Sequence, residues 1–316
     1  MPIVPATPDA IRRAAQALAR GDIVAFPTET VYGIGANALD ALAVAKVFAA
    51  KERPRFNPLI VHVPNLAEAE EYALINDLAR RLADAFWPGP LTLVFKRRST
   101  CGIADLVSAG LDTIALRAPA HPVAQALIAK AALPIAAPSA NRSGRISPTT
   151  AAHVETELDD RPAMILDGGP CPLGIESTVV AVLGDAPALL RPGALAREAI
   201  ELVLGAPLAA AAANHRGASP GQLETHYAPS TPLRLGAVSV APEEALLAFG
   251  GAIPAGARAT INLSQSGNLE EAAAKLFAAL RDLDRSGATA IAVMPIPAHG
   301  LGEAINDRLQ RAANQR

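Results

Sequence analysis

A chain of 316 residues suggests about two domains, and a hydrophobic fraction of 51% is enough for a sizeable core. The net charge of −2 and the pI near 6.3 argue against a large nonspecific nucleic-acid surface, so we expect no tight binding of nucleic acid. The two cysteines, Cys101 and Cys171, lie in no CxxC pattern, which disfavours a zinc site and favours a reducing compartment.

The signals of membrane and secreted proteins are also missing from the sequence. No apolar run reaches the roughly 18 residues that a membrane helix needs. The N-terminal segment, residues 1–13, contains no secretory apolar region. We therefore expect a cytoplasmic protein that does not associate with a membrane.

The first 204 residues alternate between strand and helix patterns. A helix is predicted over 10–20 with Thr7 as its N-cap, then a strand over Ile23–Phe26, then a helix over 41–50 that Asp40 can cap. Further strands are predicted at 59–63, 91–95, 113–116, 135–137, 164–166, 178–183 and 188–190, and further helices at 76–86, 122–132, 149–158 and 196–204. This alternation is typical of an α/β domain.

Two glycines in this region invite a specific interpretation. Gly33 and Gly35 begin a GxGxxA pattern that suggests a dinucleotide site. The preceding strand ends at Phe26, however, so the glycines do not form the strand-to-helix turn that such a site requires. We predict that they serve a tight turn. The sequence has no GxxxxGK[ST] pattern either, so any ATP site must be of another kind.

The composition changes after residue 204. Residues 205–231 contain an alanine run and no periodic pattern, which predicts a linker, and its length suggests a lid. Beyond it, strands are predicted at 233–235, 259–263 and 290–294, and helices at 243–249, 269–284 and 303–313. The expected organisation is therefore a catalytic domain over 1–204, a linker or lid over 205–231, and a small parallel α/β domain over 232–316.

Four cations lie at the predicted ends of elements: Lys51, Arg53, Arg117 and Arg191. Lys51 and Arg53 alone would read as solvated charges at a helix end. Arg117 and Arg191 each follow an apolar run and closely precede a turn-forming proline, which weighs against that interpretation. Four cations at element ends suit a polyanion such as a triphosphate, because arginine can bind phosphate or carboxylate with two hydrogen bonds.

The remaining polar candidates have simpler alternatives. A lone histidine in a strand, such as His62, is more often structural than catalytic, and Ser139, Asn141 and Ser147 suit turns or helix caps. Glu29 and Glu176 are able to bind a metal, but spacing alone does not show it, so the metal ligands stay unassigned.

Several short motifs occur in a fixed order along the chain: Phe26-Pro-Thr-Glu-Thr-Val-Tyr-Gly33, Lys51-Glu-Arg-Pro54, Pro138-Ser-Ala-Asn141, Ser147-Pro-Thr149, Glu176-Ser-Thr178 and Arg191-Pro-Gly193. The ordered set resembles the YrdC-like family, the L-threonylcarbamoyladenylate synthases. Ser219-Pro-Gly221 and His226-Tyr-Ala-Pro229 resemble the linker of the family's long, two-domain form. The resemblance implies a YrdC-like twisted mixed sheet with flanking helices, followed by a small Rossmann-like parallel α/β domain.

The resemblance also implies a reaction. L-threonine, bicarbonate or CO2, and ATP would give L-threonylcarbamoyladenylate and pyrophosphate, and the product would pass to the machinery that forms threonylcarbamoyladenosine (t6A) in tRNA. Mg²⁺ is expected on the phosphates.

Functional residues are implied in the same way. The threonine pocket would contain Thr30, His62, Arg117, Ala137 and Ser177. ATP would contact Arg53, Asn57, Thr113, Ser139, Ser147, Arg191 and, from the linker, Tyr227. The catalytic basic-polar cluster would consist of Lys51, Arg53, Ser139 and Asn141.

Two alternatives remain at this point. The chain could be a noncatalytic RNA-binding module that uses Lys96-Arg-Arg98 with Arg142 and Arg145, which predicts strongly salt-dependent RNA affinity. It could also perform carbamoyl-adenylate chemistry of the hydrogenase-maturation type. The linker motifs, and the absence of acylphosphatase or zinc-finger segments, argue against that second alternative.

Overall fold

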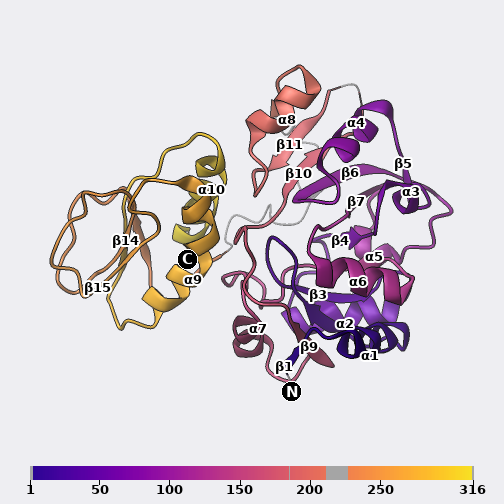
Figure 1. The fold of residues 1–316 in the computed structure, drawn as a ribbon, viewed down its shortest axis with the longest axis horizontal. Coiled ribbons are helices and arrows are strands. Elements are labelled where there is room, and N and C mark those ends of the chain that lie inside the picture. The colour runs from indigo at the N-terminus through magenta and orange to yellow at the C-terminus, as the bar shows by residue number, and fades with distance from the viewer. Residues whose placement is uncertain (1–2, 185, 211–226, 315–316) are drawn as a thin grey trace.

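The computed structural model describes residues 3–184, 186–210 and 227–314. Figure 1 shows a larger unit, drawn from indigo to salmon, beside a smaller unit drawn from orange to yellow. Residues 211–226 of the predicted linker lie outside the described residues, so its role as a lid stays a prediction.

The helices begin where the sequence offers caps. Thr7 Oγ1 accepts a hydrogen bond from the Ala10 amide (3.2 Å), and Asp40 Oδ1 accepts one from the Leu42 amide (2.9 Å), as predicted. The helices are α1 (Pro8–Ala19), α2 (Ala41–Lys51), α3 (Leu66–Ala69), α4 (Asp77–Phe86), α5 (Asp105–Ser108), α6 (Pro122–Ala131), α7 (Ala151–Leu158), α8 (Arg197–Leu204), α9 (Leu269–Asp284) and α10 (Leu301–Ala313). The short helices α3 and α5 were not predicted.

The strands of the larger unit are β1 (Ile3–Pro5), β2 (Val24–Phe26), β3 (Gly33–Asn37), β4 (Ile60–His62), β5 (Ala73–Leu74), β6 (Leu91–Arg97), β7 (Thr113–Arg117), β8 (Ile135–Ala136), β9 (Met164–Asp167), β10 (Thr178–Ala181), β11 (Ala188–Arg191) and β12 (Ala209–Ala210). Within the described residues they form one sheet in the order β1-β9-β2-β3-β8-β4-β7-β6-β10-β11-β12, with β5 paired to β6. Neighbours such as β4 and β7 are parallel, whereas β2 and β3 are antiparallel. The mixed sheet with its flanking helices confirms the predicted fold class.

The two glycines of the GxGxxA pattern lie in a strand, so the predicted tight turn is wrong. Gly35 is in β3, antiparallel to β2, and a Cβ at Gly35 would come within 2.6 Å of the Ile135 side chain and 2.8 Å of the Phe26 ring. The glycine is therefore needed because side chains from the two neighbouring strands cover its position.

Gly35→Ala is expected to lower the free energy of unfolding by about 1–3 kcal/mol, because the added methyl group overpacks this contact. Urea unfolding would measure the change. Gly184→Ala is the matched control, since no atom lies within 4 Å of the position of its Cβ. Equal midpoints for the two variants would contradict the packing argument.

The smaller unit contains a parallel sheet, again as predicted. Its strands are β13 (Leu233–Leu235), β14 (Ala245–Ala248), β15 (Ala259–Asn262) and β16 (Ile291–Val293), in the order β13-β16-β14-β15. Figure 1 shows α9 and α10 between this sheet and the larger unit.

One prediction in the smaller unit is wrong. Residues 243–249 were predicted as a helix, but Ala245–Ala248 form the inner strand β14, in which all four residues are buried. A short apolar run without alternation suits a strand covered on both faces as well as a helix, so the hydrophobic pattern did not distinguish the two.

Among the helices of the described residues, none combines the length and the apolar character required to cross a membrane.

Candidate active site

Polar side chains gather where strands of the large sheet end. His62 ends β4 and Arg117 ends the parallel strand β7, and the two residues are direct partners in the strand register. Thr28 and Thr30 lie in the turn between β2 and β3, with their hydroxyl oxygens 2.8 Å apart. Strand pairing therefore brings together side chains that are far apart in the sequence.

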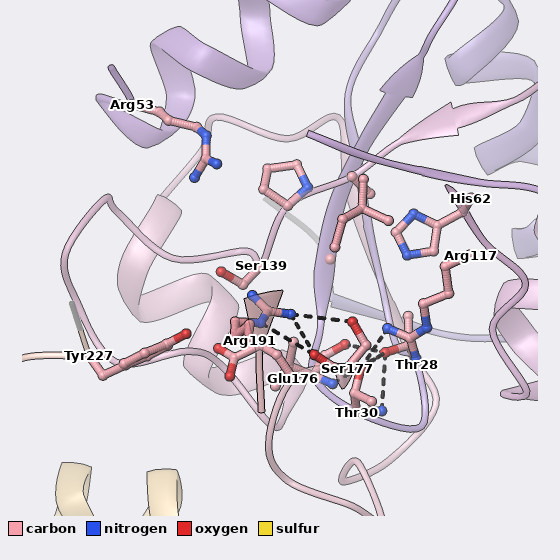
Figure 2. Close-up of a pocket in the computed structure, with 15 residues that line it drawn as sticks. Thr28, Thr30, Arg53, His62, Arg117, Ser139, Glu176, Ser177, Arg191 and Tyr227 are labelled. Atoms are coloured by element: carbon pink, nitrogen blue, oxygen red, sulfur yellow. Dashed lines mark hydrogen bonds between the residues drawn. The ribbon is translucent and has the colours of Figure 1, made fainter. Parts of the chain in front are cut away.

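These ends surround a pocket that encloses about 540 Å³, part of it open to solvent. Figure 2 shows Arg53 and Arg117 at opposite ends of it. Its lining contains the predicted residues Thr30, Arg53, His62, Arg117, Ala137, Ser139, Ser177, Arg191 and Tyr227. It also contains Thr28, Val31, Gly33, Ile60, Pro138 and Glu176, to which no contact with threonine or ATP was assigned. Thr28 and Glu176 lie within the motifs quoted above. Their place in those motifs was the signal in the sequence that could have identified them as pocket residues.

One end of the pocket is organised by a buried ion pair. Arg117 donates from Nη2 to Glu29 Oε1 (2.5 Å) and from Nη1 to Thr30 Oγ1 (3.0 Å). Burial opposes ionisation of Glu29, but the charge of Arg117 and the hydrogen bonds from Arg117 and the Ala120 amide hold its pKa below the usual value. A guanidinium and hydroxyl groups thus lie together in a site of low polarity.

His62 lies beside this ion pair as a neutral side chain. Burial, with a further contribution from the charge of Arg117, lowers the pKa of His62 to about 3. Its Nδ1 atom is buried and has no hydrogen-bond partner among the described residues. His62 is therefore suited to hydrogen bonding with a ligand and is a weak base at neutral pH.

Arg53 lies at the other end of the pocket, and Arg191 lies between the two ends. Arg53 donates to the carbonyl oxygens of Asn57 (3.2 Å) and Pro58 (2.9 Å), and no salt bridge joins it to a carboxylate within the described residues. Arg191 donates from Nη2 to the Ser177 carbonyl (2.8 Å). Burial and the nearby charge of Arg191 lower the pKa of Arg53 to about 9. A buried cation whose charge is disfavoured by a second cation nearby is suited to an anionic ligand.

Glu176 also reaches this end of the pocket. It accepts hydrogen bonds from Ser147 Oγ (2.5 Å) and from Arg308 Nε (3.1 Å). Burial opposes its ionisation, but the charges of Arg308 and Arg191 and the Ser147 hydrogen bond keep its pKa below the usual value. Ser147 therefore supports a residue of the pocket lining without being part of that lining.

The other predicted site residues that do not line the pocket are Lys51, Asn57, Thr113 and Asn141. Asn57 supports Arg53 through its carbonyl group. Asn141 donates from Nδ2 to the carbonyl oxygens of Arg142 and Arg145, both at 2.8 Å, and so shapes the loop that follows Ser139. Thr113 begins β7, at the end of the strand opposite Arg117.

Lys51 is placed differently from the phosphate contact that we predicted. It ends α2, is 1% exposed, and donates from Nζ to the carbonyl oxygens of Ser139 (2.5 Å) and Asn141. Burial, followed by the charge of Arg53, holds its pKa well below the ordinary value. In this structure Lys51 supports the backbone that carries Ser139.

Lys51→Met is therefore expected to lower the free energy of unfolding by about 2–5 kcal/mol, because two buried carbonyl groups lose their donor. Urea unfolding would measure the loss. Lys46→Met is the control, since Lys46 lies on the same helix, also donates to a backbone carbonyl, and is half exposed. A stable, inactive Lys51→Met variant would instead favour a direct catalytic role.

Comparisons with known proteins agree with this geometry. A family model described as "Telomere recombination", for Sua5, YciO and YrdC proteins, matches residues 16–193. A second model, described as "Threonylcarbamoyl-AMP synthase, C-terminal domain", matches residues 195–314. The chain belongs to the threonylcarbamoyl-AMP synthase family.

Relatives in this family match almost the whole chain. The threonylcarbamoyl-AMP synthase of Bacillus subtilis (strain 168) is 40% identical over 97% of this chain and 93% of the relative. The synthase of Pyrococcus abyssi is 41% identical over 97% of this chain and 94% of the relative. The crystal structure of P. abyssi Sua5 complexed with L-threonine superposes with a TM-score of 0.88, at 38% identity, over 97% of this chain and 95% of that one. The family resemblance and the YrdC-like fold predicted from the motifs are confirmed.

Proposed function

We propose that this protein synthesises L-threonylcarbamoyladenylate and pyrophosphate from L-threonine, bicarbonate or CO2, and ATP. The observation that carries the proposal is a single pocket with a cation at each end. Arg117 lies beside Thr30 and His62 at one end, Arg53 lies at the other end, and Arg191 lies between them, where it donates to Ser177. The first end suits an amino acid that bears a hydroxyl group, and the second suits a polyphosphate.

In the proposed mechanism, the threonine amine attacks CO2 and loses a proton to form a carbamate. A carbamate oxygen then attacks the α-phosphate of ATP. The new O–P bond replaces the bond to the β-phosphate oxygen, and pyrophosphate leaves. Two anions must approach each other, so positioning and cationic stabilisation by Arg53 and Arg191 carry the catalysis, and no covalent enzyme intermediate is required.

The carboxylates near the pocket are the first candidates for a metal site. Within the described residues, no cluster of three or more His, Cys, Asp or Glu side chains is arranged to hold an ion. Glu29 and Glu176 are each engaged by an arginine. We therefore propose that Mg²⁺ arrives as part of the ATP complex, with phosphate oxygens as its ligands.

The product is proposed to pass to the machinery that forms t6A in tRNA. The family match over nearly the whole chain favours this activity over carbamoyl-adenylate chemistry of the hydrogenase-maturation type. The RNA-binding alternative loses support, because two of its arginines are engaged in hydrogen bonds within the chain. Arg97 bonds Asp105 and Ser108, and Arg98 bonds the carbonyl groups of Glu70 and Ala73.

The test is pyrophosphate release from ATP and bicarbonate with different amino acids. Threonine is expected to give a kcat/KM at least about a hundredfold higher than valine, because valine leaves the buried hydroxyl partners unpaired. Serine, which keeps the hydroxyl group and lacks the methyl group, should lie between them. Equal values for threonine and valine would contradict the assignment of Thr30, His62 and Ser177 to the substrate pocket.

A further inference from the structure

One arginine of the smaller unit reaches the pocket region of the larger unit. Arg308 belongs to α10 and is completely buried, with 0% of its surface exposed. It donates from Nε to Glu176 Oε2 (3.1 Å) and from Nη1 both to the Pro192 carbonyl (2.7 Å) and to Asp307 Oδ2 on its own helix (2.8 Å). Glu176 and Pro192 belong to the other domain, so these contacts place an arginine of one domain beside the pocket of the other.

The same arginine contacts a second pocket residue. Its guanidinium carbon lies 5.2 Å from the centre of the Tyr227 ring. A second support comes from α9, whose Phe277 stacks on Tyr227 with ring centres 5.4 Å apart. Helices α9 and α10 therefore fix two lining residues, Tyr227 and Glu176, from outside the pocket.

The contact between Arg308 and Glu176 matters for an anionic ligand because Glu176 is itself negatively charged. A carboxylate in the pocket lining repels a triphosphate unless a cation compensates it. The charged and titratable groups around Glu176 are Arg308 and Asp307 on α10, Arg191 on β11, Lys51 on α2, and Tyr227. Arg308 and Ser147 are the ones that bond the Glu176 side chain in the described residues.

We propose that Arg308 is a positioning residue of the ATP site: it compensates Glu176 and holds both Glu176 and Tyr227 in place. Arg191 then does not have to compensate Glu176 alone and can interact with phosphate. The C-terminal domain thereby completes the nucleotide end of the active site. The inference rests on the proposed function for the identity of the ligand.

A second ion pair between α10 and the larger unit provides a matched control. Arg197 on α8 bonds Glu303 on α10, with Nε 3.1 Å from Oε2, so this ion pair also joins the two domains. Both side chains are about one-third exposed, and neither lines the pocket. Arg197→Met and Arg308→Met each break one interdomain ion pair, but only the second changes the surroundings of Glu176.

The experiment measures ATP binding by calorimetry and the steady-state kinetics of pyrophosphate release in the full-length variants. Arg308→Met is expected to raise the Kd and the KM for ATP about tenfold or more, and to leave the KM for threonine within about twofold of wild type. Arg197→Met should keep both constants within about twofold. The double variant Glu176→Gln/Arg308→Met should recover most of the loss of ATP affinity, because it removes the uncompensated carboxylate.

Equal ATP affinity in Arg308→Met and Arg197→Met overturns the inference. So does a double variant that binds ATP no more tightly than Arg308→Met, since a merely structural role of Arg308 gives no such recovery. If Arg308→Met does not fold, the double variant and Arg308→Lys are compared with wild type by the same measurements. A wild-type protein that binds ATP without releasing pyrophosphate would count against the proposed reaction, while the calorimetry would still decide the role of Arg308.

Discussion

Replacing Arg117 with methionine is expected to abolish threonine-dependent pyrophosphate release and to lower the free energy of unfolding by about 3–5 kcal/mol. Arg117 and Glu29 form an ion pair in which the side chains are 4% and 9% exposed. Removing the arginine leaves the carboxylate buried without its cation, and it also removes the cation at the threonine end of the pocket, which is suited to bind the carboxylate of threonine.

A double variant separates these two consequences. In Glu29→Gln/Arg117→Met the uncompensated charge is gone, and the amide of glutamine is able to replace part of the hydrogen bonding. This variant should regain much of its stability in urea unfolding while its use of threonine stays lost. Recovery of wild-type kcat/KM for threonine in the double variant would show that Arg117 serves stability alone.

Much of the site could be predicted, because the relevant residues end apolar runs. His62 lies near the end of the predicted strand 59–63, Arg117 follows the predicted strand 113–116, and β4 and β7 pair in parallel so that the two residues meet. The sequence predicts that each strand ends there, but the pairing of the strands depends on contacts across the whole sheet. The motifs of the family supplied that information indirectly.

Other features depend on long-range contacts that a local pattern does not contain. Lys51 in the last turn of α2 reads as a solvated charge or a ligand, yet the loop that carries Ser139 and Asn141 buries it. Glu176 finds its partner Arg308 132 residues later, in a different domain. The strand β14 was mistaken for a helix because its apolar run does not reveal that the sheet is covered on both faces.

The second large effect is expected at the nucleotide end of the pocket. Arg53→Ala should lower kcat/KM for ATP on the order of a hundredfold, equivalent to about 3 kcal/mol of transition-state stabilisation, with little loss of threonine affinity. The reason is that Arg53 is buried at 8% exposure and lines the pocket, and that within the described residues its guanidinium hydrogen-bonds only carbonyl oxygens, so its charge is available to a phosphate.

Arg55→Ala is the control for this change, because Arg55 is an exposed arginine two positions along the same loop. It should retain wild-type kinetics.

The more informative comparison is Arg53→Lys, which keeps the charge and loses the planar fork. If the fork positions the phosphates, lysine should restore only part of the lost rate. If charge alone is required, lysine should restore most of it. Wild-type turnover by Arg53→Ala at limiting ATP would show that the buried cation stabilises the loop and takes no part in the reaction.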